Sequence, residues 1–174
     1  MYSKAVKKGK NMKNFVVGID PGKKGAIAFV DKDTLEAEVY LMPQFVVDLI
    51  SMLKSRQRSI LLVVLEKQQP FPRQGIVSTF NLGEHYGIIK GILHTLGIPY
   101  EEISARKWQR KLLGNFTTVN HKDRRKLIKT LSLKKAKALF PMTDIGNHDG
   151  KSDALLIAEY GRRFFVVNKE KKSE

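Results

Sequence analysis

Short apolar runs separated by turn residues dominate the first 41 positions of the chain. Residues 14–20 form an almost unbroken apolar run rich in β-branched side chains, which is typical of a central strand covered on both faces. Residues 25–31 and 35–41 follow as two further strands, the second with alternating apolar and polar side chains, and the link between them is short enough for a hairpin. The pattern therefore predicts three consecutive strands at the start of the domain.

Helical spacing of apolar residues follows these strands. Positions 45, 46, 49, 50 and 53 are apolar, which predicts a helix over residues 44–54. Residues 59–65 then form a second strongly apolar strand, which ends at Glu66. A loop containing proline and glycine covers residues 67–75, and a long helix is predicted over residues 76–96.

The remaining sequence predicts one more strand and three further helices. The strand runs from Gly97 to about Ile103, and a short helix contains residues 106–111. A strongly basic helix is predicted over residues 122–139, and a closing helix begins near Asp149. This order predicts an α/β fold with a mixed five-stranded sheet, the first three strands antiparallel, flanked by helices.

Three glycines recur every fourth residue on the long helix, at positions 83, 87 and 91. Each costs a helix about 1 kcal/mol relative to alanine, so a stripe of them indicates that something packs closely against this side. Two explanations stay open at this point. The stripe packs against the sheet of the same chain, or it forms the contact of a symmetric dimer.

Charge and composition narrow the class of protein. The 174 residues carry 32 Lys and Arg against 17 Asp and Glu, a net charge of +15, and twelve of the basic residues lie between positions 101 and 140. Clustered positive charge indicates a polyanionic partner, most commonly nucleic acid. The absence of cysteine excludes disulfides and cysteine-based zinc sites.

The length fits one domain with two tails. We expect a flexible basic arm over residues 1–13, a folded domain over residues 14–167 and a charged tail over residues 168–174. No apolar run approaches the roughly 20 residues that span a bilayer, and no secretory signal precedes the first strand. A soluble, intracellular protein without a membrane partner is the resulting expectation.

Four carboxylates lie at the ends of predicted elements. Asp20 and Glu66 each end an apolar strand, and Asp149 and Asp153 share one face at the start of the closing helix. Each alone is an ordinary turn, strand-end or helix N-terminal acid. Together they predict a site for Mg²⁺ or Mn²⁺, provided that the two strands are parallel neighbours, because carboxylate oxygens are the ligands these ions prefer. Two such ions in one site clamp the attacking and leaving oxygens of a phosphoryl displacement.

Three segments carry a resemblance to a known family. The run Gly18-Ile19-Asp20-Pro21-Gly22 with Gly25-Ala26 resembles the opening strand of the RuvC family of Holliday-junction resolvases. Glu66 after Val63-Val64-Leu65 resembles its second acidic strand end, and residues 153–158 resemble its closing helix. The segment from Tyr86 to Trp108 looks especially like phage and related bacterial members. The resemblance covers about residues 15–165 and has all three motifs in the family's order.

The resemblance implies an RNase H-like nuclease that binds four-way DNA junctions as a homodimer. It implies paired nicks by water activated with two Mg²⁺ or Mn²⁺ ions per site, with Asp20, Glu66 and Asp153 as ligands. The fourth position departs from the family, because Gly150 stands three residues before the final aspartate, where other members often have an acid or histidine. We expect Asp149 to replace it, with His148 in reserve.

The resemblance also bears on DNA contacts. The aromatic residue that the family has three positions after the second acid is Gln69 here, and Phe71 is the expected substitute that wedges against an unstacked base. Basic side chains of the short and long basic helices are expected to bind phosphates. They are Lys107, Arg110 and Lys111, with Arg124, Arg125 and Lys126 as a broader positive surface.

Two other functions stay open on sequence alone. A nuclease for RNA–DNA hybrids or for RNA processing shares the same carboxylates, and a branched-nucleic-acid-binding protein without cleavage activity would share the basic surface. An intact carboxylate set argues against the second of these. Trp108 is expected to be a buried anchor of its helix and not a platform for stacking bases.

Overall fold

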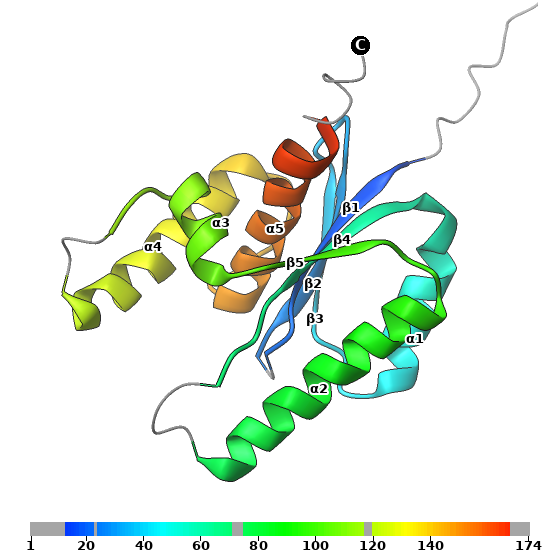
Figure 1. The fold of residues 1–174 in the computed structure, drawn as a ribbon. Coiled ribbons are helices and arrows are strands. Elements are labelled where there is room, and N and C mark those ends of the chain that lie inside the picture. Colours follow the sequence, from blue (N-terminus) through cyan, green and yellow to red (C-terminus); the bar gives the residue numbers. More distant parts are fainter. Residues whose placement is uncertain (1–12, 23, 71–74, 117–119, 168–174) are drawn as a thin grey trace, which may run out of the picture.

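A computed structural model describes residues 13–22, 24–70, 75–116 and 120–167 (Figure 1). Its centre is one sheet in the order β3-β2-β1-β4-β5, in which β1 pairs antiparallel with β2 and parallel with β4. The mixed five-stranded sheet with three antiparallel opening strands is thereby confirmed. The strands are β1 (Phe15–Asp20), β2 (Ala26–Asp31), β3 (Ala37–Leu41), β4 (Ile60–Glu66) and β5 (Tyr100–Ile103).

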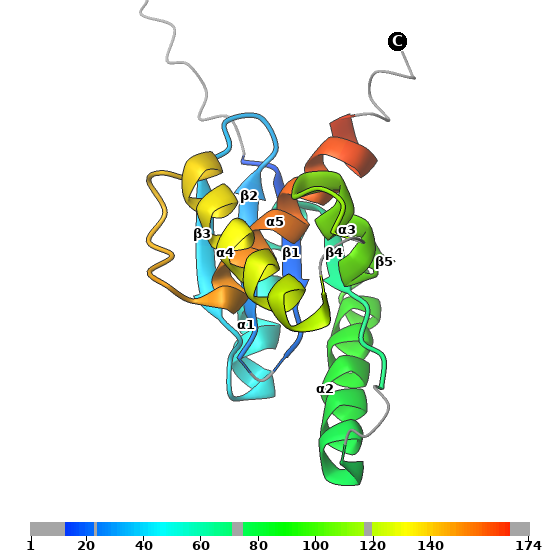
Figure 2. The ribbon, with the colours of Figure 1, turned by 90° about the vertical axis from the view of Figure 1, so that its left-hand side faces the viewer.

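Helices cover both faces of this sheet (Figures 1 and 2). The buried side chains of α3, α4 and α5 form one core with the sheet, and those of α1 and α2 form a second core on the opposite face. A π-helical turn, η2, continues α5, and a 3₁₀ turn, η1, follows α1. The bounds are α1 (Val46–Arg56), η1 (Gln57–Ser59), α2 (Ile76–Thr95), α3 (Ala105–Leu112), α4 (His121–Leu139), α5 (Asp149–Gly161) and η2 (Arg162–Val167).

The two cores explain why the central strands are apolar throughout. Side chains alternate between the faces of a strand, so Val16 and Val64 lie in the core beneath α5 while Val17 and Val63 lie in the core beneath α1 and α2. A strand with solvent on one face would need polar residues at every second position. The sequence pattern of β1 therefore follows from its place in the middle of a covered sheet.

The third strand begins two residues later than the sequence pattern predicts. Asp31 Oδ1 accepts hydrogen bonds from the backbone amides of Asp33 (3.0 Å) and Thr34 (2.8 Å), which closes the turn after β2. Leu35 then adopts a left-handed conformation with φ of 62°. Pairing with β2 resumes at Ala37, so the prediction of strand structure from residue 35 is wrong.

Glycines allow α5 to lie directly on β1 and β2. A Cβ atom on Gly18 would overlap the backbone of Ala154 and Ala158, and one on Gly150 would lie 2.9 Å from the Cα of Gly25. Side chains at these positions would hold the helix away from the sheet. The glycines thus fix the depth at which the acidic first turn of α5 lies beside the end of β1.

The glycine stripe of α2 has no such partner within the chain. A Cβ atom on Gly83, Gly87 or Gly91 would meet no atom within 4 Å among the described residues. Packing of the stripe on the chain's own sheet is therefore wrong. Figure 2 shows α2 extending past the sheet, and its buried residues, Ile89, Ile92 and Leu93, lie in its second half.

Two further expectations concern the ends of the chain and membranes. The regular elements of the described residues fall within residues 15–167, while residues 1–12 of the expected arm and the tail from residue 168 lie outside the described residues. Within the described residues, no helix combines the length and apolar character that crossing a bilayer requires.

Candidate active site

Asp20 and Glu66 end neighbouring parallel strands. Ile19 of β1 is in register with Leu65 of β4, so the two acids that follow lie at the same level of the sheet edge. The condition set by the sequence, that these strands be parallel neighbours, is met. Both acids are only partly accessible, because α5 covers one side of this edge.

Asp153 approaches the same edge from α5. Electrostatic interactions couple Glu66 to Asp20 and Asp153, and Asp153 to Asp20. Burial raises the pKa of Glu66 to about 7, and the charges of Asp20 and Asp153 add to this effect. Burial likewise raises the pKa of Asp153 to about 7, with the charges of Asp20 and Asp149 adding to it, and burial raises the pKa of Asp20. The fold therefore gathers three partly desolvated acids that repel one another.

Protein groups donate hydrogen bonds to Asp20 and to Glu66. The backbone amide of Gly22 donates to Asp20 Oδ1 at 3.2 Å, as in an ordinary turn after a strand. The indole Nε1–H of Trp108 donates to Glu66 Oε1 at 2.7 Å. Trp108 is fully buried, as expected, but its contact with an acid 42 positions away in the sequence was not predicted.

The departure at position 150 has a steric cause. Gly150 is buried against the backbone of Lys24 and Gly25, so the side chain of an acid or histidine has no room there. The two residues before Gly150, Asp149 and His148, have different contacts. Asp149 forms an ion pair with Lys129 of α4, while His148 accepts the Lys151 amide at Nδ1 (3.3 Å) and interacts with the charge of Asp20.

The carboxylates of Asp20, Glu66 and Asp153 have the chemistry of a site for a hard divalent cation. They do not lie in a complete coordination arrangement. Carboxylates that are partly buried and mutually repulsive gain from a divalent cation that neutralises them. Among the described residues, however, no group of three or more His, Asp or Glu side chains is arranged so that it could hold a metal ion as it stands. The carboxylates would therefore have to move closer together on binding a metal ion.

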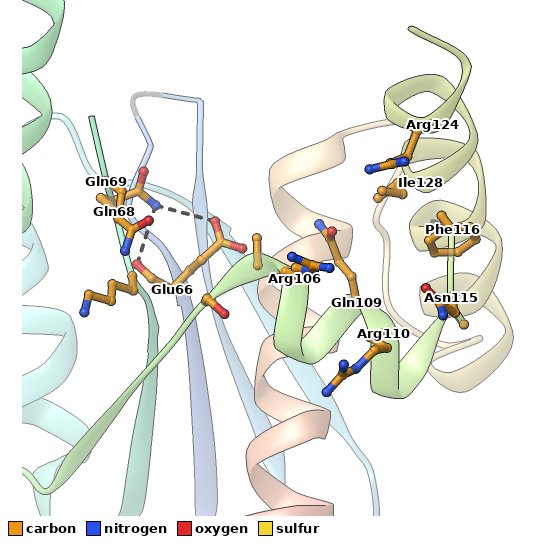
Figure 3. Close-up of a pocket in the computed structure, with 14 residues that line it drawn as sticks. Glu66, Gln68, Gln69, Arg106, Gln109, Arg110, Asn115, Phe116, Arg124 and Ile128 are labelled. Carbon is orange, nitrogen blue, oxygen red and sulfur yellow. Dashed lines mark hydrogen bonds between the residues drawn. The ribbon is translucent and has the colours of Figure 1, made fainter. Parts of the chain in front are cut away.

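A cleft of about 580 Å³ opens beside Glu66, between the end of β4, α3 and the first half of α4 (Figure 3). Three arginines line it, and Figure 3 shows Arg106 and Arg110 on α3 with Arg124 across from them on α4. Amide side chains supply much of the rest of the wall. These other lining residues include Lys67, Gln68, Gln69, Gln109, Asn115 and Phe116.

The cleft contains some of the residues expected to contact DNA and omits others. Arg110 and Arg124 line it, and Arg106 joins them although it was not singled out. The exposed side chains of Lys107, Arg125 and Lys126 do not line the cleft, and Lys111 lies over the ring of Phe164 at 5.8 Å. Phe71, the expected wedge, lies outside the described residues.

Glu66→Gln is expected to raise the stability of the metal-free protein at pH 8. An acid whose pKa is raised on folding contributes stability below its unfolded pKa, near 4.5 for Glu66, and loses it as the pH rises through the folded value of about 7. The glutamine side chain lacks the negative charge that repels the other two acids. Its oxygen can still accept a hydrogen bond from Trp108. We expect a gain of about 1–2 kcal/mol at pH 8, roughly 2–8 °C in Tm.

The gain should shrink as the pH is lowered through 7 toward 5, because Glu66 is then protonated in the folded state and no longer carries a charge that repels Asp20 and Asp153. Thermal unfolding in chelator at pH 5 and pH 8 measures both effects. Asp33→Asn is the matched control, since Asp33 is an exposed acid in the turn after β2. A Glu66→Gln protein less stable than wild type at pH 8 would contradict the repulsion between the acids.

Comparison with known proteins shows which solved structures have a similar fold. No family model and no curated protein sequence matches the chain. The structure of Thermus thermophilus RuvC in complex with a Holliday junction substrate matches with a TM-score of 0.54 and 18% identity, over 86% of this chain and 95% of that chain. A second Thermus thermophilus RuvC structure matches with a TM-score of 0.49 and 18% identity, over 85% and 95% of the two chains. The chain has the RuvC type of RNase H-like fold.

Proposed function

We propose that the chain is a metal-dependent endonuclease that resolves four-way DNA junctions, which arise in recombination and repair. The observation that carries the proposal is the meeting of Asp20, Glu66 and Asp153 at one sheet edge beside an arginine-lined cleft. The RuvC fold supports it, because the matched RuvC structure is a complex with a Holliday junction. The net charge of +15 supports a polyanionic substrate.

The acids would serve as the metal ligands. Asp20, Glu66 and Asp153 would hold Mg²⁺ or Mn²⁺, with Asp149 as the fourth ligand and His148 as its alternative. When bound, two such ions would activate a water molecule and stabilise the charge that develops on the scissile phosphate. Asp149 would first have to leave its ion pair with Lys129. His148 would coordinate through Nε2, because its Nδ1 caps α5.

The cleft would position the DNA backbone. Arg106 and Arg110 lie one turn apart on α3 and line the same cleft as Glu66, so their guanidinium groups would donate to phosphate oxygens beside this acid. Gln68 and Gln109 also line the cleft and can donate to phosphates or to base edges. The distribution of charge predicts binding that weakens steeply with salt.

We further propose that α2 forms a symmetric dimer contact. Ile76 and Phe80 share a face of α2 with the three glycines, and they are 89% and 67% exposed. An apolar groove of about 250 Å³, lined by Ile50, Ile88 and Gly91 among others, continues this surface toward α1. The α2 helix of a second copy of the chain fits such a surface. The glycines would let the two helices approach closely, and the partner helix would cover the exposed apolar side chains at the start of α2.

Phe80→Glu is expected to convert the dimer to a monomer. The charge would lie in the proposed contact, where burial of an unpaired carboxylate is costly. Sedimentation equilibrium or light scattering should show the mass of one chain at concentrations where the wild type is dimeric. Met142→Glu is the control, because Met142 is 96% exposed in the loop between α4 and α5. A dimeric Phe80→Glu protein would place the contact elsewhere.

One cleavage assay tests the function. The protein is incubated with labelled four-way junction, linear duplex and RNA–DNA hybrid, each with Mg²⁺, with Mn²⁺ and with chelator. Symmetric metal-dependent nicks in the junction alone are the expected result. Cutting of the hybrid alone would assign an RNA–DNA hybrid nuclease, and tight binding of the junction without cleavage would assign a binding protein.

A further inference from the structure

The contact between Trp108 and Glu66 joins the buried core to the candidate site. Trp108 lies on α3, is fully buried and belongs to the core beneath α5. The indole Nε1–H is a hydrogen-bond donor and cannot accept, so a buried tryptophan needs one acceptor as its partner. That partner is a carboxylate oxygen of Glu66, Oε1, at 2.7 Å.

We propose that Trp108 is a positioning residue that fixes the orientation of the Glu66 carboxylate for metal binding. This inference rests on the proposed metal-dependent nuclease. The indole holds Oε1, while the contact of Gln68 Nε2 with Oε2 is 3.5 Å long, at the limit of a hydrogen bond. Oε2, which has the weaker of the two contacts, would therefore be the oxygen more available to a cation.

Glu66 needs such a restraint because of its neighbours. The negative charges of Asp20 and Asp153 repel its carboxylate, and rotation toward solvent would relieve that repulsion. A hydrogen bond from a neutral N–H to a charged oxygen is stronger than one between neutral groups, and it opposes this rotation.

The donor is itself immobile, which distinguishes it from Gln68. Trp108 packs in one cluster with Ile103, Leu112 and Leu155, and the ring has no exposed surface. Groups that orient a metal ligand act best when packing locks their own rotamers, and their loss commonly costs about 10–100-fold in metal affinity or activity. A purely structural tryptophan would affect stability without affecting the metal.

The first measurement uses the intact protein. Trp108 is the only tryptophan of the chain, so a ¹H–¹⁵N spectrum contains a single indole N–H resonance. We expect this resonance far downfield in the metal-free wild type, unmoved by Asp33→Asn and shifted upfield by Glu66→Gln. An indole resonance that is identical in wild type and Glu66→Gln would overturn the contact.

The second measurement uses Trp108→Phe, which keeps an aromatic ring in the core and removes the N–H. We expect Mg²⁺ affinity, measured by calorimetry without DNA, to fall about 10-fold or more, and kcat on the junction to fall similarly with KM unchanged. Leu112→Ala is the packing control on the same helix, because it should lose stability with unchanged Mg²⁺ affinity.

Wild-type Mg²⁺ affinity and kcat in a folded Trp108→Phe protein would overturn the inference. Equal losses of Mg²⁺ affinity in Trp108→Phe and Leu112→Ala would also overturn it, since packing alone would then explain the effect. Failure of the wild type to cleave any DNA would count against the proposed function. The indole resonance and the calorimetry would still decide whether Trp108 orients Glu66 for a metal ion.

Discussion

Asp20→Asn is expected to reduce junction cleavage by a factor on the order of 10³ or more, with little change in junction binding. The substitution removes a negative charge from the proposed metal site. An asparagine oxygen can still accept the hydrogen bond of the Gly22 amide, so the turn after β1 should persist. Single-turnover cleavage with saturating protein separates the chemical step from binding, and a mobility-shift titration in chelator measures binding.

Two comparisons make this result specific. Asp33→Asn removes an exposed acid far from the site and should cleave like the wild type. Asp149→Asn and His148→Ala compete for the fourth position, and the larger loss identifies the ligand. An Asp20→Asn protein that cleaves at the wild-type rate would refute the carboxylate mechanism.

Gly18→Ala is expected to destabilise the fold by about 3 kcal/mol or more, because the added methyl group overlaps backbone atoms of α5 that cannot rotate away. The helix would have to rise from β1, which would also move Asp153 away from Asp20. Urea unfolding measures the stability, and the loss of cleavage should exceed what the unfolded fraction explains.

Gly83→Ala is the matched control for this glycine. Its added methyl group would meet open space on α2, so the helix should gain up to about 1 kcal/mol. Both substitutions are best compared in the Phe80→Glu background, where self-association does not contribute. Equal stability of the two alanine variants would show that α5 does not depend on Gly18 for its position.

Sequence periodicity was sufficient to predict the type and order of the main elements. The apolar runs of β1 and β4 reflect burial on two faces, and the spacing in α1 reflects its two buried leucines, Leu49 and Leu53. The start of β3 was missed because a local turn overrode the pattern. The hydrogen bonds of the Asp31 side chain and the left-handed conformation of Leu35 determine where β3 begins. Hydrophobic periodicity predicts neither of them.

The acids of the site were predictable and their surroundings were not. Asp20 and Glu66 follow apolar strands, and parallel neighbouring strands bring their ends together. Trp108 contacts Glu66 only because α3 folds back over the end of β4. The pattern of apolar residues along the sequence does not predict such a contact. Arg106 was missed for the same reason, since three neighbouring basic residues give no indication of which one lines a cleft.

The register of β1 and β4 has a consequence for how the length of such chains can vary. Successive residues of a strand point to opposite faces, so deleting one residue inside β4 would shift the strand by one position and turn Glu66 toward the face of α1 and α2. Lys67 would then take its place beside Asp20. Insertions in the exposed turn between β2 and β3 carry no such penalty, because Asp33 and Thr34 there lie far from the acids in the fold. Natural length differences among chains of this fold should therefore gather in such turns and avoid the segment from Ile60 to Glu66.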